Sequence, residues 1–351
     1  MRPIALLVLL MTFARAGDAP ALPVAVAADD PNVRYSGRWD RRDAGGPRCE
    51  WPACAVHLVV DGGPVNVVLG GLAEHAFQVV VDGEPTSVIT LVDGQTVYPV
   101  VPSLAPGRHT IELCKRTECW RLPVQVRGFQ LGAGVALAPP TAPTRRIEFL
   151  GDSITCGYGN EAKSQDERFS YATENAWLAW GAIAARRLAA DYSCVAMSGI
   201  WLQQDGENRP LPTFWESTMP LTDPTPWDFS RWQADAVVVN LGTNDSGKPI
   251  DRARWTEAYR AFIARIRAVY PAAHIFLVIG PMGHGPDRVI PIYNEEIVAS
   301  ARAAGDTRIH ALALPDQDGA DGIGADWHPS VATHRGMAER IAAAIRDELG
   351  W

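Results

Sequence analysis

The sequence has no cluster of basic residues, no extended polar tract and no long apolar run beyond its first residues. No later segment offers the roughly 20 consecutive apolar residues that a membrane-spanning helix needs. The formal net charge is −8 and Lys and Arg are scattered. These features disfavour nucleic acid as a partner and favour a neutral or weakly charged substrate. With 47% apolar and 21% charged residues over 351 positions, the chain has a globular composition, and its length favours two domains.

Cysteine is also scarce, with six residues. None has CxxC spacing and no histidine cluster accompanies them, so we expect no metal and no cofactor. Residues 1–16 read as a signal peptide, with a charged start, a short apolar stretch and a small-x-small end. We therefore expect a secreted or periplasmic protein, in which disulfides are stable. Of the 15 connectivities that six cysteines allow, spacing favours Cys49 with Cys54, Cys114 with Cys119, and Cys156 with Cys194.

The first half of the mature chain predicts antiparallel β structure. Short valine-rich runs between about 33 and 130 are separated by Asp-Gly turns, and no segment with helical periodicity interrupts them. We expect a β-sandwich domain over residues 30–131. Residues 132–144 contain three prolines and no charge, which indicates a linker.

The second half, residues 145–351, predicts an α/β/α sandwich. The expected strands are nearly continuously apolar, as in a parallel sheet buried on both faces, and amphipathic helices separate them. The strands fall at 145–150, 194–199, 234–242, 274–280 and 310–314, and the helices at 174–190, 254–270, 291–305 and 332–349.

Chemically useful residues follow these strands. Ser153 comes after the first strand, Gly199 after the second, Asn244 after the third, and His328 stands near the C-terminus. Ligands of such sheets bind beyond the carboxyl ends of the strands. The four residues supply a hydroxyl, a flexible backbone N–H, a side-chain amide and an imidazole, which are the parts of an acyl-transfer site.

Each residue has an expected role. Ser153 is a weak nucleophile until a base within hydrogen-bonding reach accepts its proton, and we assign that base to His328. The oxyanion formed from an ester carbonyl needs donors aimed at it, and we assign the Ser153 N–H, the Gly199 N–H and the Asn244 side-chain amide. Glycine at 199 is expected to allow close backbone approach.

Taken singly, each of these residues is as well explained by a turn or a helix cap. Their order after successive strands is more specific, and with it the chain resembles the SGNH or GDSL-type hydrolases. In that resemblance Gly151-Asp152-Ser153 corresponds to the nucleophile block, Gly199 to the glycine block, Gly242 through Asp245 to the GxND block, and His328 to the histidine block. The resemblance implies a flavodoxin-like SGNH fold.

A narrower resemblance covers nearly the whole mature chain. The strings SGRWD near residue 36, GDSITCGYGN and ENAWLAWGAIAARRLAA are similar to carbohydrate esterase family 2. Members of that family join a jelly-roll domain to an SGNH domain and remove acetyl groups from xylan and glucomannan, often at the sugar 6-position. The resemblance implies secretion and no metal.

The third catalytic residue departs from the wider superfamily, which usually has an Asp three residues before the histidine. That position is Ala325 here, and Asp326 follows it. The group that orients His328 is therefore either Asp326 or a backbone carbonyl, and the sequence does not choose between them.

Four further residues are expected to contact substrate. Trp201 and Trp327 stand beside Gly199 and His328, and tryptophan is seldom fully buried. His284 follows a predicted strand and is the second candidate for a histidine in the cleft, and Asp152 precedes the nucleophile.

The sequence thus predicts a secreted, monomeric serine esterase that removes O-acetyl groups from polysaccharide through an acetyl-serine intermediate. A lipase or thioesterase on the same scaffold and a bacterial envelope glycan deacetylase are the enzymatic alternatives. A carbohydrate-binding protein is the alternative without catalysis, although such a protein has no use for an activated nucleophile.

Overall fold

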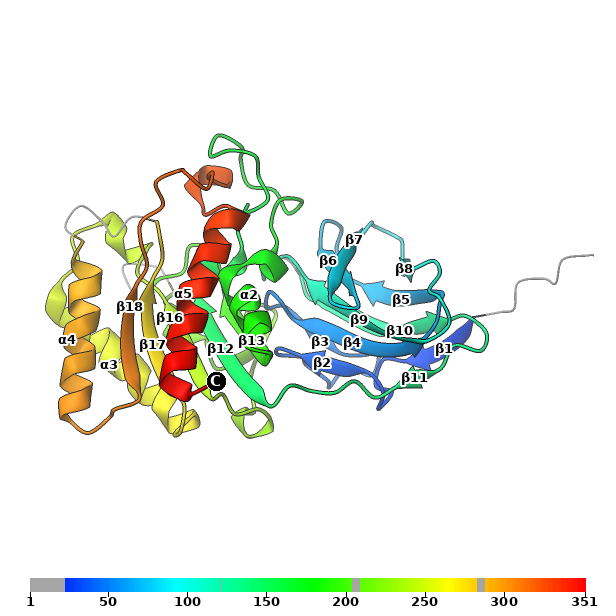
Figure 1. Cartoon of the computed structure of the whole chain (residues 1–351), viewed down its shortest axis with the longest axis horizontal. Coiled ribbons are helices and arrows are strands. Elements are labelled where there is room, and N and C mark those ends of the chain that lie inside the picture. Colours follow the sequence, from blue (N-terminus) through cyan, green and yellow to red (C-terminus); the bar gives the residue numbers. More distant parts are fainter. Residues whose placement is uncertain (1–22, 121, 204–208, 283–287) are drawn as a thin grey trace, which may run out of the picture.

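The computed structural model describes residues 23–120, 122–203, 209–282 and 288–351. It has a β-rich N-terminal part and an α/β C-terminal part that lie side by side (Figure 1). The expected signal peptide, residues 1–16, and His284 lie outside the described residues. In the part of the chain that the structure describes, no helix is long and apolar enough to cross a membrane.

Two antiparallel sheets form the N-terminal part, which confirms the predicted sandwich. The first contains β1 (Val24–Ala27), β3 (Arg48–Cys49), β5 (Val65–Gly70), β8 (Val97–Val101) and β10 (Val124–Leu131). The second contains β2 (Arg34–Ser36), β4 (Ala55–Asp61), β6 (Ala76–Val81), β7 (Glu84–Thr90), β9 (Arg108–Lys115) and β11 (Leu137–Ala138). Alternating side chains such as Val65, Val67 and Leu69 are fully buried between the sheets, as a strand with one core-facing side requires. β11 extends the second sheet from within the expected linker by pairing with β4.

A five-stranded parallel sheet forms the centre of the C-terminal part. Its order is β13-β12-β16-β17-β18, with bounds β12 (Arg145–Gly151), β13 (Ala190–Ala196), β16 (Ala236–Asn240), β17 (His274–Ile279) and β18 (Ile309–Ala313). Numbered within this part alone, the order is 2-1-3-4-5, which is the flavodoxin-like arrangement. That arrangement has its topological switch point between the first and third strands, here β12 and β16. Ser153 follows β12 and Asn244 follows β16, so both lie at that point.

Helices cover both faces of this sheet, which confirms the predicted α/β/α sandwich (Figure 1). Phe149, Val238 and Phe276 belong to the core beneath α2 (Trp180–Arg187) and α5 (Val331–Leu349). Their neighbours Leu150 and Val239 belong to the core beneath α3 (Arg252–Val269) and α4 (Val289–Ala303). The remaining elements are α1 (Ser153–Cys156), the short pair β14 (Ser217–Met219) and β15 (Asp223–Pro226), and the 3-10 turns η1 (Ala176–Leu178), η2 (Leu211–Thr213), η3 (Phe229–Arg231), η4 (Asp245–Gly247) and η5 (Ala325–Trp327).

The helix predicted over 174–190 is shorter in the structure. Asn175 caps the 3-10 turn η1 by accepting a hydrogen bond from the Trp177 N–H at 3.1 Å, and α2 begins only at Trp180. Ala189 has a left-handed φ of 49°, and β13 starts at the next residue. A side chain that competes for backbone hydrogen bonds explains the late start.

The three predicted disulfides are not formed, and all six cysteines are buried free thiols. Cys114 approaches the Tyr192 hydroxyl at 3.8 Å, whereas Cys119 points to the Ala196 carbonyl at 4.0 Å. Cys156 and Cys194 likewise approach different polar groups, and Cys49 and Cys54 are only in hydrogen-bonding contact. Nearness along the chain therefore did not bring these side chains into disulfide geometry, which requires specific Cβ directions.

A buried ion pair joins the two parts of the chain. Arg38 follows β2 and donates to the Glu148 carboxylate of β12 at 2.8 Å, with both side chains fully buried. The same guanidinium donates to the Ser217 carbonyl at 3.1 Å, and the Trp215 indole donates to Glu148 at 3.2 Å. Each charge is therefore satisfied by several partners, which is the condition for burying it. The Arg of the SGRWD string holds the sandwich against the central sheet.

Replacing Arg38 is expected to destabilise the protein strongly. In Arg38→Met the Glu148 carboxylate keeps its burial and loses its cation, so we expect a loss of about 3–5 kcal/mol in chemical denaturation. The double variant Arg38→Met/Glu148→Met should recover part of that loss, since no buried charge remains. Arg252→Gln is the matched control, because its pair with Glu296 has side-chain exposures of 63% and 41% and should contribute about 0.2–1 kcal/mol. Equal losses for Arg38 and Arg252 would contradict the account.

Candidate active site

The structure brings Ser153 and His328 together. Ser153 is the first residue of α1 and follows β12 directly, while His328 precedes α5. The Ser153 Oγ and the His328 Nε2 are 2.8 Å apart, which is hydrogen-bonding distance. Two residues separated by 175 positions thus form a hydroxyl–imidazole pair of the kind that activates a serine.

Backbone carbonyls orient the His328 ring. Its Nδ1 lies 3.2 Å from the Ala325 carbonyl oxygen and 3.3 Å from that of Asp326. Because a carbonyl can only accept, Nδ1 must carry the proton and Nε2 is left to accept from the serine hydroxyl. Asp326 and Trp327 have left-handed φ values of 48° and 68°, a conformation uncommon outside glycine. This turn directs the two carbonyls at the ring.

The Asp326 carboxylate points elsewhere, so of the two orienting groups that the sequence left open, this geometry favours the backbone carbonyls. One oxygen accepts from the Phe169 N–H at 2.9 Å and the Tyr158 hydroxyl at 3.1 Å, and the other pairs with Arg168 at 2.9 Å. The Tyr158 ring in turn packs on the His328 ring with centroids 4.1 Å apart. The Asp326 side chain therefore fixes the segment beneath the imidazole, and only the backbone carbonyl of this residue contacts the ring.

Close packing of two loops sets the position of this turn. The Ala325 N–H donates to the Gly159 carbonyl at 3.0 Å. A Cβ at Gly159 would lie 2.4 Å from the Ala325 Cβ, so only glycine permits this approach. The third glycine of the GDSITCGYG stretch thus sets the position of the turn that carries His328.

The other two predicted residues lie on adjoining loops. The Asn244 amide donates one of its two N–H groups to the Ile200 carbonyl at 2.8 Å and keeps a second donor. The Asp245 carboxylate accepts the N–H groups of Leu202 and Gln203, both at 3.0 Å, and ties the Gly199 loop to the Asn244 loop. Gly199 has a left-handed φ of 75°, and a Cβ there would meet open space. The left-handed conformation by itself favours glycine here, and the close approach of substrate expected from the sequence stays a prediction.

Sequence reasoning missed Glu118, which holds the Gly199 loop from the other domain. Glu118 follows β9, is buried, and its Oε2 accepts the Ser198 N–H at 2.7 Å. Burial raises the pKa of Glu118 above its usual range. The backbone N–H of Glu118 donates to Glu174 at 3.1 Å, and Lys115 donates to the Glu118 carbonyl at 3.1 Å. A single glutamate between two cysteines carries no local pattern that would have identified it.

The predicted substrate contacts divide into two groups. Trp327 is 58% exposed beside His328, and Trp201 is half-buried beside the Gly199 loop, so both can meet a ligand. Asp152 is fully buried and caps α1 by accepting the Ile154 N–H at 3.0 Å, which contradicts the expected contact with substrate. Burial raises its pKa to about 7, and the neighbouring Asp245 adds to the rise. His284 is outside the described residues.

Two pockets of about 270 Å³ flank the Gly199 loop. Gly199 itself, Phe214 and Leu221 line the first, together with Trp120 of the N-terminal part, which is 53% exposed. Trp201 and Lys248 line the second, and the Lys248 ammonium lies 6.0 Å from the Trp201 ring centroid. Aromatic and apolar walls next to hydrogen-bond donors are typical of small-molecule sites.

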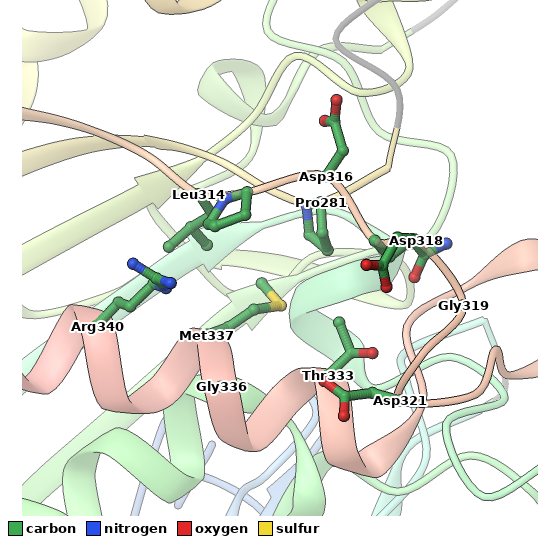
Figure 2. A pocket seen from close by; sticks show the side chains of 12 residues that line it. Pro281, Leu314, Asp316, Asp318, Gly319, Asp321, Thr333, Gly336, Met337 and Arg340 are labelled. Carbon is green, nitrogen blue, oxygen red and sulfur yellow. The ribbon is translucent and has the colours of Figure 1, made fainter.

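A third pocket, of about 240 Å³, lies between α5 and the segment that follows β18 (Figure 2). Met337 and Arg340 of α5 lie at one end, and Asp318 and Asp321 at the other. The Asp318 carboxylate accepts the Ala320 N–H at 2.9 Å, and Asp316 pairs with Arg288. This pocket contains neither a nucleophile nor an imidazole and does not belong to the serine–histidine site.

Among the residues that the structure describes, one group could hold a metal ion: His274, His310 and Glu348. His274 is the first residue of β17 and His310 is the second residue of β18. Both therefore lie at the amino end of the sheet, opposite to Ser153. His310 already contacts His274 at 3.0 Å, Arg302 at 3.0 Å and Glu348 at 3.2 Å. These mutual contacts explain why the three side chains lie together. The group takes no part in the serine–histidine site.

The protonation state of His328 suits a base. Burial lowers its pKa below the ordinary 6.5, although the two carbonyl contacts oppose the shift. The ring is therefore neutral at neutral pH and able to accept the Ser153 proton. Gly199 and Asn244 follow the strands on either side of β12, and their role as donors to an oxyanion stays a prediction.

This fold and site define a GDSL-type hydrolase. The GDSL-like Lipase/Acylhydrolase family model matches residues 149–335, and the Carbohydrate esterase 2 N-terminal model matches residues 35–140. The chain belongs to carbohydrate esterase family 2, as the sequence motifs indicated.

Two curated proteins and one solved structure illustrate the relationship. Cellulase/esterase CelE of Acetivibrio thermocellus is 40% identical over 92% of this chain, which spans 40% of that protein's length. An acetylxylan esterase / glucomannan deacetylase of Cellvibrio japonicus is 26% identical, with 93% and 91% of the two chains covered. The structure of a family two carbohydrate esterase from Clostridium thermocellum in complex with cellohexaose is 39% identical, with a TM-score of 0.86 and 91% and 99% coverage.

Neutralising Asp326 should have little effect on turnover. In Asp326→Asn the carbonyls at 325 and 326 still hold His328, so we expect kcat to fall less than about tenfold, against about 10⁴ where an Asp carboxylate orients the histidine. The check is steady-state hydrolysis of an aryl acetate, with thermal unfolding as the control for the lost Arg168 and Phe169 contacts. A fall near 10⁴ with an intact fold would show that the carboxylate, and not the backbone, orients the ring.

Proposed function

We propose that this protein is a secreted or periplasmic esterase that removes O-acetyl groups from plant polysaccharide of the xylan or glucomannan type. The 2.8 Å contact between Ser153 Oγ and His328 Nε2, next to the donors of Gly199 and Asn244, carries the proposal. The acetylxylan esterase relative supports the choice of substrate. The signal-like residues 1–16 support export.

The proposed reaction has two halves. Ser153 Oγ attacks the acetyl carbonyl while His328 Nε2 takes its proton, and the oxyanion accepts hydrogen bonds from the N–H groups of Ser153 and Gly199 and from the Asn244 amide. His328 then gives the proton to the departing sugar hydroxyl, which leaves an acetyl-serine. Water, deprotonated by His328, releases acetate and restores the serine.

Carbohydrate acetate is favoured over a long-chain lipid ester by the surroundings of the serine. Asp245, Lys248 and Asp251 line the pocket that contains Trp201. An acyl chain of eight carbons placed there would bury apolar surface against those charges. The exposed ring of Trp327 instead offers a face on which a pyranose can pack.

The test is acetate release from a panel of acetylated polysaccharides, with aryl esters of two to eight carbons measured in parallel. We expect release from acetylated xylan or glucomannan and aryl-ester rates that fall from acetate to octanoate. Ser153→Ala should abolish both activities, and Asn244→Ala should lower kcat by about 10²–10³ with the fold intact. Full activity in Ser153→Ala, or rates that rise towards octanoate, would overturn the proposal.

The pH profile provides an independent check on His328. Because the base must be neutral, kcat/KM should rise with pH through the pKa of this histidine. Burial lowers that pKa, so the midpoint should lie below 6.5 and activity should persist in mildly acidic solution. A midpoint clearly above 6.5 for aryl acetate hydrolysis would contradict a buried histidine as the base.

A further inference from the structure

A pocket of about 250 Å³ lies between the two parts of the chain, away from the serine–histidine site. Residues of β2 and the following turn form one wall, the start of β13 forms the floor, and residues 227–232 form the other wall. Ser153 and Gly199 stand at the carboxyl end of the sheet, whereas this pocket opens at the amino end of β13. The intervening strand is roughly 20 Å of extended chain.

Aromatic rings line the pocket and are held in fixed orientations. The Trp39 indole donates to the Ser36 carbonyl at 2.8 Å, and Tyr35 packs edge-on against Trp39 with centroids 4.9 Å apart. The Trp232 indole donates to Asp191 at 3.3 Å, and Trp227 lies across from these rings. Rigid rings present contact area at little cost in conformational entropy, which favours binding a ligand with an apolar face.

The pocket also carries a positive charge that is not neutralised. Arg41 and Arg231 are exposed on its rim, and among the described residues neither has a carboxylate within ion-pair distance. Asp191, the acidic residue of the lining, is already paired with Arg34 at 3.2 Å. The Arg41 guanidinium lies over the Tyr35 ring, 4.9 Å from its centroid, and burial together with the charge of Arg231 lowers the pKa of Arg41. Hydrogen bonds from Ser230 and the charge of Arg231 lower the pKa of Asp228.

We propose that this pocket binds a sugar ring that carries a carboxylate, that is, a single uronic acid residue. Two guanidinium groups that line one pocket match a carboxylate in charge, and the indole rings of Trp227 and Trp232 match the apolar face of a pyranose. The pocket volume equals that of roughly eight molecules of liquid water. This is enough for one sugar ring but not for an oligosaccharide. The site holds an acidic sugar at a distance from the serine, and this inference stands whether or not the proposed esterase activity is found.

The test is calorimetric titration of the full chain with sodium D-glucuronate at low ionic strength. We expect saturable binding that weakens as salt is added, because the guanidinium groups are exposed. Three further titrations separate the contributions: D-glucose lacks the carboxylate, acetate lacks the ring, and benzoate replaces the sugar by an aromatic ring. Each should bind at least tenfold more weakly than glucuronate.

Single-residue variants test whether glucuronate binds in this pocket. Arg41→Gln and Arg231→Gln should each weaken glucuronate binding at least tenfold and leave aryl acetate hydrolysis unchanged. Arg127→Gln, which changes an exposed arginine of β10 outside the pocket, is the matched control and should bind as the parent does. Ser153→Ala should also bind as the parent does, which distinguishes this pocket from the serine site.

The proposal is overturned if the parent protein shows no saturable binding of glucuronate, if glucose or benzoate binds equally well, or if Arg41→Gln and Arg231→Gln bind like Arg127→Gln. Loss of binding in Ser153→Ala alone would place glucuronate in the serine site and overturn it as well.

Discussion

The hydrogen bond between Ser153 and His328 depends on the backbone more than on any charged side chain. Two carbonyl oxygens fix the proton on Nδ1 and leave Nε2 facing the serine hydroxyl. The left-handed turn at Asp326 and Trp327 creates that geometry, and the Asp326 carboxylate stabilises the turn from below. A left-handed backbone conformation at a residue other than glycine is strained, and it persists only where surrounding contacts enforce it. The packing of Gly159 on Ala325 is one of these contacts, so the glycine-rich stretch after the serine also shapes the histidine turn.

The N-terminal sandwich contributes to the site as well as to stability. Arg38 fixes it to the central sheet through Glu148, and Glu118 reaches the Ser198 N–H next to Gly199. A displacement of the sandwich would therefore shift the Gly199 loop and with it a donor that we assign to the oxyanion. Trp120 from the same domain borders the neighbouring pocket. The two parts of the chain form one functional unit in which the β domain supports the loop at the end of β13.

Sequence patterns predicted the fold well, because hydrophobic periodicity reports directly on burial. They also identified Ser153 and His328, since residues after successive parallel strands converge at one edge of the sheet. They failed where side-chain direction decides. Asp152 adjoins the nucleophile but turns inward as a helix cap, and Cys114 and Cys119 point to different partners. Glu118 was missed because its partner lies 80 positions away in the other domain. The left-handed φ values of Asp326 and Trp327 direct carbonyl groups, and not a carboxylate, at the His328 ring. The amino-acid sequence of this turn does not indicate those φ values.

The central claim is that the geometry around Ser153 makes its hydroxyl a strong nucleophile through His328. Labelling with a serine-directed fluorophosphonate, followed by peptide mapping by mass spectrometry, measures that reactivity directly. The account predicts one modified residue, Ser153, and labelling that is lost in a folded His328→Ala variant. Modification of a different serine, or undiminished labelling of Ser153 without His328, would contradict it.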